Sequence, residues 1–159
     1  MIIAFFELIQ QSNLAQILRS SIWLYPFINF AHIIGMILFF GSLIPLDLRV
    51  LGFGQWQVEL KQLDQILKPL VKLGLILVLL SGSLLFLTRP LDYINAEIFL
   101  LKIIFILIAL GNGFLFTISR NWQLALIHNK CDRKLKAMAL FSIVLWTCVV
   151  LCGRLVGYR

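Results

Sequence analysis

The segment Ser21–Gly52, SIWLYPFINFAHIIGMILFFGSLIPLDLRVLG, decides the fold because it combines a membrane-length apolar run with buried polar residues. Its apolar part, about residues 22–46, exceeds the roughly 20 residues that a helix needs to cross a bilayer. Asn29 and His32 lie within this run, and Asp47 and Arg49 follow it. A polar side chain at that depth needs a partner, which is either a neighbouring helix or a ligand.

The composition places the whole chain in the membrane. Of its 159 residues, 61% are apolar and only 13% are charged, and the mean hydropathy is +0.98. These values exclude an ordinary soluble domain. The formal charge of +7 indicates loops beside anionic lipid and gives no reason to expect nucleic acid as a partner. We therefore predict one integral membrane domain, residues 1–159, with no attached soluble module.

The apolar runs predict an all-α, four-transmembrane-helix antiparallel bundle. The expected crossings are about residues 22–46, 70–88, 98–118 and 137–156. Amphipathic stretches at about 2–18 and 56–67 predict an N-terminal interfacial helix and a second surface helix in the first loop. Within the second crossing, Gly74, Ser81 and Thr88 recur every seven residues. This seam of small side chains predicts close packing against another helix.

Basic residues predict the orientation. Nine lie in the two loops on one side of the membrane and five on the other. The positive-inside rule places the richer side in the cytoplasm. Because four crossings leave both termini on the same side, we expect a multi-pass protein of the bacterial inner membrane with periplasmic termini. The nine are Arg49, Lys61, Lys68, Lys72, Arg120, Lys130, Arg133, Lys134 and Lys136, and the five are Arg19, Arg89, Lys102, Arg154 and Arg159.

The orientation predicts that polar residues gather in the outer half of the bundle. His32 lies about 15 Å below the outer end of its crossing, and Asn29 lies one turn above it. Lys102 opens the third crossing, and Arg154 lies near the end of the fourth. We expect these four residues to line an outward-facing pocket. The alternatives are that His32 only fixes helix packing and that Lys102 and Arg154 extend to the headgroups.

The chemistry of the pocket suggests haem or copper. A neutral histidine binds either metal, and nearby cations suit haem propionates or another anion. His128 falls in a cytoplasmic loop and cannot reach the same metal. A haem would therefore use His32 alone, His32 with Lys102, or a site shared across a homo-oligomer.

Other site chemistries find little support in the sequence. It contains no nucleophile triad, paired carboxylates or phosphate loop. The acidic residues fall at interfaces or loops, which argues against a proton-driven transporter. Cys131, Cys148 and Cys152 lack metal-finger spacing, and we expect the last two to be small packing residues.

Several motifs resemble a family of uncharacterised bacterial four-helix membrane proteins. They cover nearly the whole chain: WLYPFINFAHIIG (23–35), PLDLRVLG (45–52), LFLTRPLDYIN (85–95), Lys102, Asn112 and GRLVGY (153–158). More remotely, the layout is similar to the superfamily of the copper-resistance D membrane domain and the HemJ-type protoporphyrinogen oxidase. In that superfamily a first-helix histidine precedes a glycine and a lysine opens the third helix, a pattern matched here by His32, Gly35 and Lys102.

That second resemblance implies a function. In the HemJ type the histidine is implicated in binding haem b and the lysine is important for activity, which assigns these roles to His32 and Lys102. The segment 45–49, PLDLR, departs from the aromatic and Leu-Pro-Arg run of the oxidase, so the oxidase reaction is not implied. We expect a small inner-membrane haem b or redox protein. The alternatives are a copper or small-solute binding or transport protein and a non-catalytic scaffold.

Overall fold

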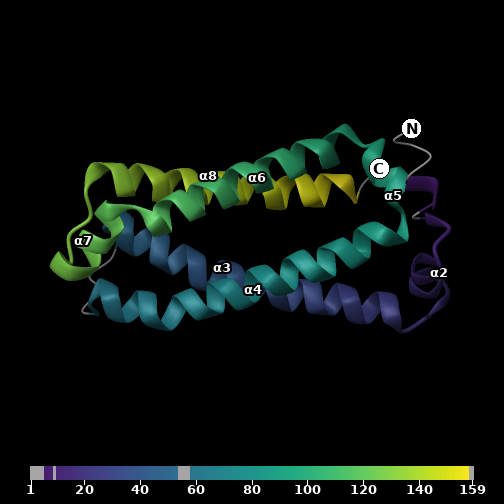
Figure 1. Ribbon diagram of the computed structural model, residues 1–159, viewed down its shortest axis with the longest axis horizontal. Helices are drawn as coiled ribbons and strands as arrows, with labels where there is room; N and C mark the ends of the chain where they lie inside the picture. The colour runs from purple at the N-terminus through teal and green to yellow at the C-terminus, as the bar shows by residue number, and fades with distance from the viewer. Residues whose placement is uncertain (1–5, 9, 54–57, 158–159) are drawn as a thin grey trace.

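The computed structural model describes residues 6–8, 10–53 and 58–157, and helices are the regular elements of this part of the chain (Figure 1). Each of the four long helices is long and apolar enough to cross a membrane. They are α3 (Leu24–Leu51), α4 (Leu60–Thr88), α6 (Glu97–Ile118) and α8 (Arg133–Val156). The predicted all-α bundle with four spans is confirmed, and the chain has the fold of a multi-pass membrane protein.

Short helices distinguish the two ends of the bundle (Figure 1). One end, called the terminal end below, carries α2 (Asn13–Ser20), α5 (Pro90–Ile94) and the last turn of α8. The opposite end, called the loop end, carries α7 (Arg120–His128) and the last turn of α3. Most of the basic residues counted above therefore lie toward the loop end.

The bundle consists of two helical hairpins. α3 packs along α4 and α6 along α8, and contact between α3 and α8 joins the pairs. At the α3–α4 crossing, a Cβ atom on Gly74 would lie 2.5 Å from the backbone nitrogen of Phe39, so only glycine permits this approach. Ser81 and Thr88 are buried on the same seam. The predicted seam of small residues is confirmed.

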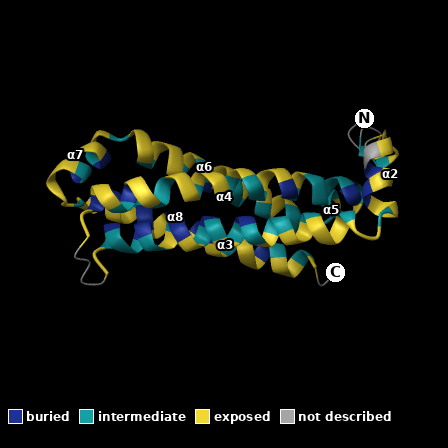
Figure 2. Ribbon diagram, turned by 90° about the horizontal axis from the view of Figure 1, so that it is seen from below, coloured by how far each residue is buried: buried dark blue, intermediate teal, exposed yellow. Residues whose placement is uncertain are grey.

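Two clusters of buried apolar side chains hold the hairpins together. One fills the loop end, and the other fills the centre. Figure 2 shows that the outer faces of the long helices are largely exposed, as expected for surfaces that contact lipid. The loop-end cluster is Leu46, Val50, Leu60, Trp122, Ala125, Leu135 and Ala139, and the central cluster is Phe39, Ala109, Leu145, Trp146 and Val149.

The separate surface helix predicted at residues 56–67 is wrong. Residues 60–67 form the first turns of α4, which continues through Pro69, and residues 54–57 lie outside the described part of the chain. A proline inside a helix removes a backbone hydrogen bond and costs about 3 kcal/mol. Burial of Leu60, with Leu63 and Leu67 packed against the loop-end cluster, offsets that cost.

The first and last spans also extend beyond the predicted boundaries. α3 continues through Pro45 and ends at Leu51, where Gly52 adopts a φ of +90°. α8 begins at Arg133 because the Asp132 carboxylate accepts a hydrogen bond from the Leu135 N–H at 2.9 Å. Capping residues, here Gly52 and Asp132, thus set boundaries that hydropathy alone misplaces.

The N-terminal helix predicted at residues 2–18 is interrupted. Residues 6–8 and 10 are helical, Gln11 and Ser12 form a turn and a bend, and α2 then begins at Asn13. The Ser12 hydroxyl accepts a hydrogen bond from the Ala15 N–H at 3.3 Å and thereby caps the new helix. Residues 2–5 and 9 lie outside the described part.

Candidate functional site

His32 lies on α3 and faces α4. Its Nδ1 atom is 2.9 Å from the Ser81 hydroxyl oxygen, and that hydroxyl donates its single proton to the Leu77 carbonyl at 2.5 Å. The Ser81 oxygen therefore accepts a hydrogen bond from Nδ1–H. In its neutral form the imidazole therefore carries its proton on Nδ1 and its lone pair on Nε2.

Gly82 makes room for the His32 ring on α4. A Cβ atom at this position would lie 3.2 Å from the ring carbon Cε1, which is closer than ordinary contact. The ring is held between the Ser81 hydroxyl and the bare backbone of Gly82, and it is half-buried. The sequence pattern placed Ser81 on the seam of small residues but did not single out Gly82, which follows it directly in the sequence.

Lys102 lies in the second turn of α6 and turns toward α8. Its Nζ atom is 3.3 Å from the position that a Cβ would occupy on Gly153, so this glycine provides space for the ammonium group. The side chain is half-buried, and its charge acts on the His32 imidazole across the space between the hairpins. The structure thus brings His32 and Lys102 to the same part of the bundle from opposite hairpins.

The structure does not place Asn29 and Arg154 in a pocket with His32 and Lys102, as the sequence predicted. Both side chains are exposed, and the hydrogen bond described for His32 goes to Ser81 instead of Asn29. Three residues along a helix correspond to about 300° of rotation, so Asn29 is turned some 60° away from the narrow face that meets α4. The prediction that Asn29 lines the bundle interior is therefore corrected. Arg154 lies on the last turn of α8 at the terminal end.

An aromatic cluster covers the terminal side of His32 and Lys102. Phe86 of α4 and Phe99 of α6 stack with centroids 5.4 Å apart and planes only 8° from parallel. Tyr93 of α5 lies 5.1 Å from Phe99, and Phe6 meets Phe86 edge-on at 6.1 Å. The two phenylalanines on the long helices each lie about one turn from the candidate site. The cluster therefore bridges the two hairpins beyond the site.

A second group of aromatic rings covers the central side. Phe39 and Trp146 form an edge-on pair with centroids 4.6 Å apart, and Phe40 lies 5.2 Å from Phe39. These rings join α3 to α8 at the level where the central cluster begins. His32 and Lys102 thus lie between two aromatic layers, in surroundings that strengthen electrostatic interactions.

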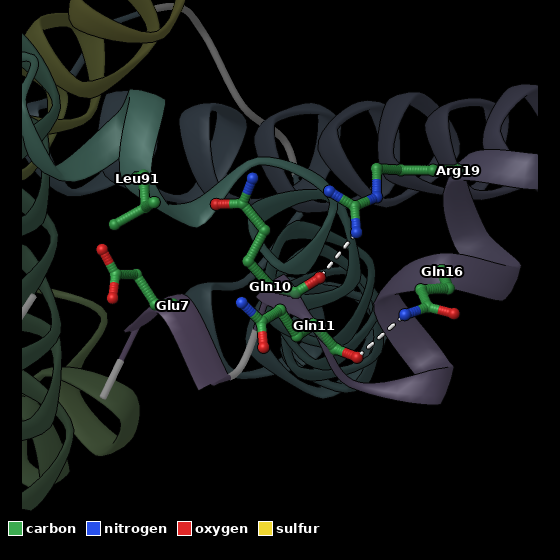
Figure 3. Close-up of a pocket in the computed structure, with 6 residues that line it drawn as sticks. All are labelled: Glu7, Gln10, Gln11, Gln16, Arg19 and Leu91. Carbon is green, nitrogen blue, oxygen red and sulfur yellow. Dashed lines mark hydrogen bonds between the residues drawn. The ribbon is translucent and has the colours of Figure 1, made fainter. Parts of the chain in front are cut away.

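Two surface hollows lie away from this site. The larger, of about 340 Å³, is at the terminal end and is lined by Glu7, Gln10, Gln11, Gln16, Arg19 and Leu91 (Figure 3). There the Arg19 guanidinium donates to the Gln10 carbonyl at 2.6 Å, and the Gln16 amide donates to the Gln11 carbonyl at 3.0 Å. The other hollow, of about 330 Å³, lies on α4 around Lys68 and Pro69. Neither contains His32 or Lys102.

Within residues 6–8, 10–53 and 58–157, no three histidine, cysteine, aspartate or glutamate side chains are grouped so that they could hold a metal ion. His128 closes α7 at the loop end, whereas His32 lies toward the terminal end. Comparison with protein-family models, curated proteins and solved structures finds no match to this chain.

Proposed function

We propose that this protein is a small haem b protein of the bacterial inner membrane, with His32 as the axial ligand through Nε2. The main support is the hydrogen-bond chain from Nδ1–H of His32 through Ser81 to the Leu77 carbonyl. Histidines that bind metals typically donate their other ring N–H to such a partner, which fixes the tautomer and the ring orientation. Haem b in this position would supply a one-electron redox couple.

The absence of a group of three metal-binding side chains among the described residues favours haem over copper. A copper ion usually needs several protein ligands, whereas the porphyrin supplies four and leaves one or two to the protein. The grouping of metal-binding side chains that a protein-bound copper ion needs is not found among the described residues. A single histidine beside apolar and aromatic side chains fits the requirements of haem.

Lys102 has the position and charge to bind a haem propionate. Its ammonium group lies against Gly153 of α8, and the side chain is half-buried. Arg154, at the terminal end of α8, would provide a second cation for an anionic group nearer the membrane surface. Asn29 has no role in this proposal because its side chain is exposed.

The concentration of basic residues at the loop end supports a cytoplasmic position for that end. The terminal end, with the candidate site in its half of the bundle, would then face the periplasm. Resemblance to the HemJ-type superfamily agrees with this proposal, since His32 and Lys102 occupy the matching positions. The oxidase activity itself is not part of the proposal.

Absorption spectroscopy tests the proposal. Full-length protein, expressed with a haem precursor or loaded with hemin in detergent, should show a Soret band that is lost in His32→Ala. Asn29→Ala, which alters an exposed side chain one turn away, should retain the band and is the matched control. We expect Ser81→Ala to bind haem about 10- to 100-fold more weakly, because Nδ1–H loses its acceptor.

Two outcomes would reject haem binding through His32. The first is a wild-type protein that shows no Soret band under either condition. The second is a band that persists unchanged in His32→Ala. If wild-type protein is colourless and His32→Ala only lowers thermal stability, His32 serves helix packing and the protein acts as a scaffold.

A further inference from the structure

Asp47 is a buried carboxyl group at the contact between the two hairpins. It lies on α3 one turn before the end of the helix, and only 5% of its surface is exposed. The Ser142 hydroxyl of α8, itself buried, hydrogen-bonds to the carboxyl group. Because α3 and α8 form the contact that joins the hairpins, the charge of Asp47 bears directly on that contact.

The second carboxyl oxygen of Asp47 has no hydrogen-bond partner within the part of the chain that the structure describes. Its Oδ2 atom is buried and accepts no hydrogen bond from the described residues. An ionised carboxylate in such surroundings would carry its charge with a single neutral donor. Burial of a charge without a counter-ion is very costly, whereas the neutral acid avoids most of that cost.

The cations around Asp47 form no ion pair with it among the described residues, and the Arg49 Nε atom is itself buried without a described hydrogen-bond partner. On α3 itself, the Arg49 guanidinium donates to the Asn129 side chain at 3.1 Å. On α4, Lys68 pairs with Asp64 at 3.6 Å. On α8, Lys136 lies beside Gly52, about one turn further toward the loop end. Among the residues that the structure describes, no ion pair reaches Asp47.

We propose that Asp47 is a proton-binding site and that its carboxyl group is neutral while α3 and α8 are packed together. The proton resides on Oδ2, and Oδ1 accepts from Ser142. Separation of α3 from α8 lets water reach the group, which then ionises to a carboxylate and releases its proton to solvent at the loop end. Proton binding is thereby coupled to the contact between the hairpins.

The coupling predicts how stability changes with pH. The folded state binds more protons at Asp47 than the unfolded state, so the stability from this group is present at acidic pH and is lost as pH rises. The thermal unfolding midpoint of the full-length protein in detergent should therefore fall from mildly acidic to mildly alkaline pH. Asp47→Asn, which is neutral at every pH, should flatten this dependence.

Infrared spectroscopy detects the proposed proton directly. At neutral pH the wild-type protein should show the carbonyl stretch of a protonated carboxylic acid, shifted in heavy water and absent in Asp47→Asn. Asp64→Asn removes a buried but ion-paired acid and is the matched control, so it should keep both the band and the pH dependence. Ser142→Ala should retain the band and shift its frequency, because the hydrogen bond to the acid is removed.

Any of three results would overturn the proposal. One is an acid band that is missing from the wild type at neutral pH or unaffected in Asp47→Asn. Another is a pH dependence of stability that Asp47→Asn leaves unchanged. The third is a stabilisation of the wild type by sodium that choline at equal ionic strength does not give and that Asp47→Asn abolishes. That result would identify a metal-cation site. If Asp47→Asn does not fold, the band shift in Ser142→Ala decides the assignment.

Discussion

At the scale of single residues, the polar groups of this protein take their roles from what surrounds them. His32 has a hydroxyl on one nitrogen and a bare glycine against its ring, whereas Asn29, three residues away, is exposed. Asp47 has one neutral donor, and its other oxygen has no partner among the described residues. The residue type alone does not distinguish these situations, because each depends on the neighbouring helix.

The fit of the imidazole ring against α4 can be tested at Gly82. In Gly82→Ala the new methyl group would lie 3.2 Å from the ring, so the ring must shift. We expect stability to fall by about 1 kcal/mol, at the lower end of the cost of overpacking. Gly111→Ala is the control, since a methyl group there meets nothing within 4 Å and alanine favours a helix. Denaturant titrations measure the free energy of unfolding of both variants. Equal losses of stability in Gly82→Ala and Gly111→Ala would contradict the proposed contact.

Cys131 lies between α7 and α8, and its thiol should become reactive only at a higher pH than a thiol in the unfolded chain. Burial raises the pKa of this thiol, against a smaller opposing effect of Arg49 and Lys136. Because the thiolate is the reactive form, alkylation at neutral pH should be slower than in the unfolded chain and should accelerate only at higher pH. The measurement is the alkylation rate against pH in a variant with the two α8 cysteines replaced by serine. The same midpoint in folded and unfolded protein would refute this prediction.

At the scale of secondary structure, packing overrides local signals. Pro69 and the amphipathic pattern before it predict a separate surface helix, yet α4 continues through this proline. The apolar side chains that form the amphipathic pattern instead pack against the loop-end cluster. One long helix buries them while keeping the polar side of its first turns exposed.

Replacement of Pro69 should therefore stabilise α4. Pro69→Ala restores a backbone donor and removes the clash of the ring with the preceding turn, so we expect a gain of up to about 3 kcal/mol. Lys72→Ala, at an exposed position further along the same helix, should change stability little. Thermal unfolding of the two variants measures the difference. A loss of stability in Pro69→Ala would mean that the proline has a structural role in α4.

At the scale of the whole molecule, Asn129 makes polar contacts that link helix ends at the loop end of the bundle. Asn129 adopts a φ of +54°, and its side-chain oxygen accepts from Arg49 at 3.1 Å and from the Leu60 N–H at 3.0 Å. One residue thus ties the end of α3, the start of α4 and the turn after α7 together. Such a contact limits how the two hairpins separate.

Loss of this link should weaken the loop end. Asn129→Gly permits the same backbone conformation but removes the shared acceptor, so we expect a loss of about 1–3 kcal/mol. Hydrogen exchange should show faster opening at the start of α4, with little change near His32. Asn121→Ala, which removes an exposed hydrogen bond to Asp132, is a control for loss of a polar side chain at the same end. Unchanged protection at the start of α4 would contradict the role given to Asn129.

The sequence by itself determined the class of this protein, its four spans and the seam of small residues. Hydropathy and helical periodicity are local properties, and a bilayer requires long apolar helices whatever packs beside them. Only the tertiary structure decided which polar side chains meet, which helix ends extend and which carboxyl group is buried. Each of these depends on how a helix is rotated about its axis. A shift of one residue along a helix turns the side-chain direction by about 100°. Hence His32 meets Ser81 and Gly82, Asn29 turns away, and Asp47 lies against Ser142 between the hairpins.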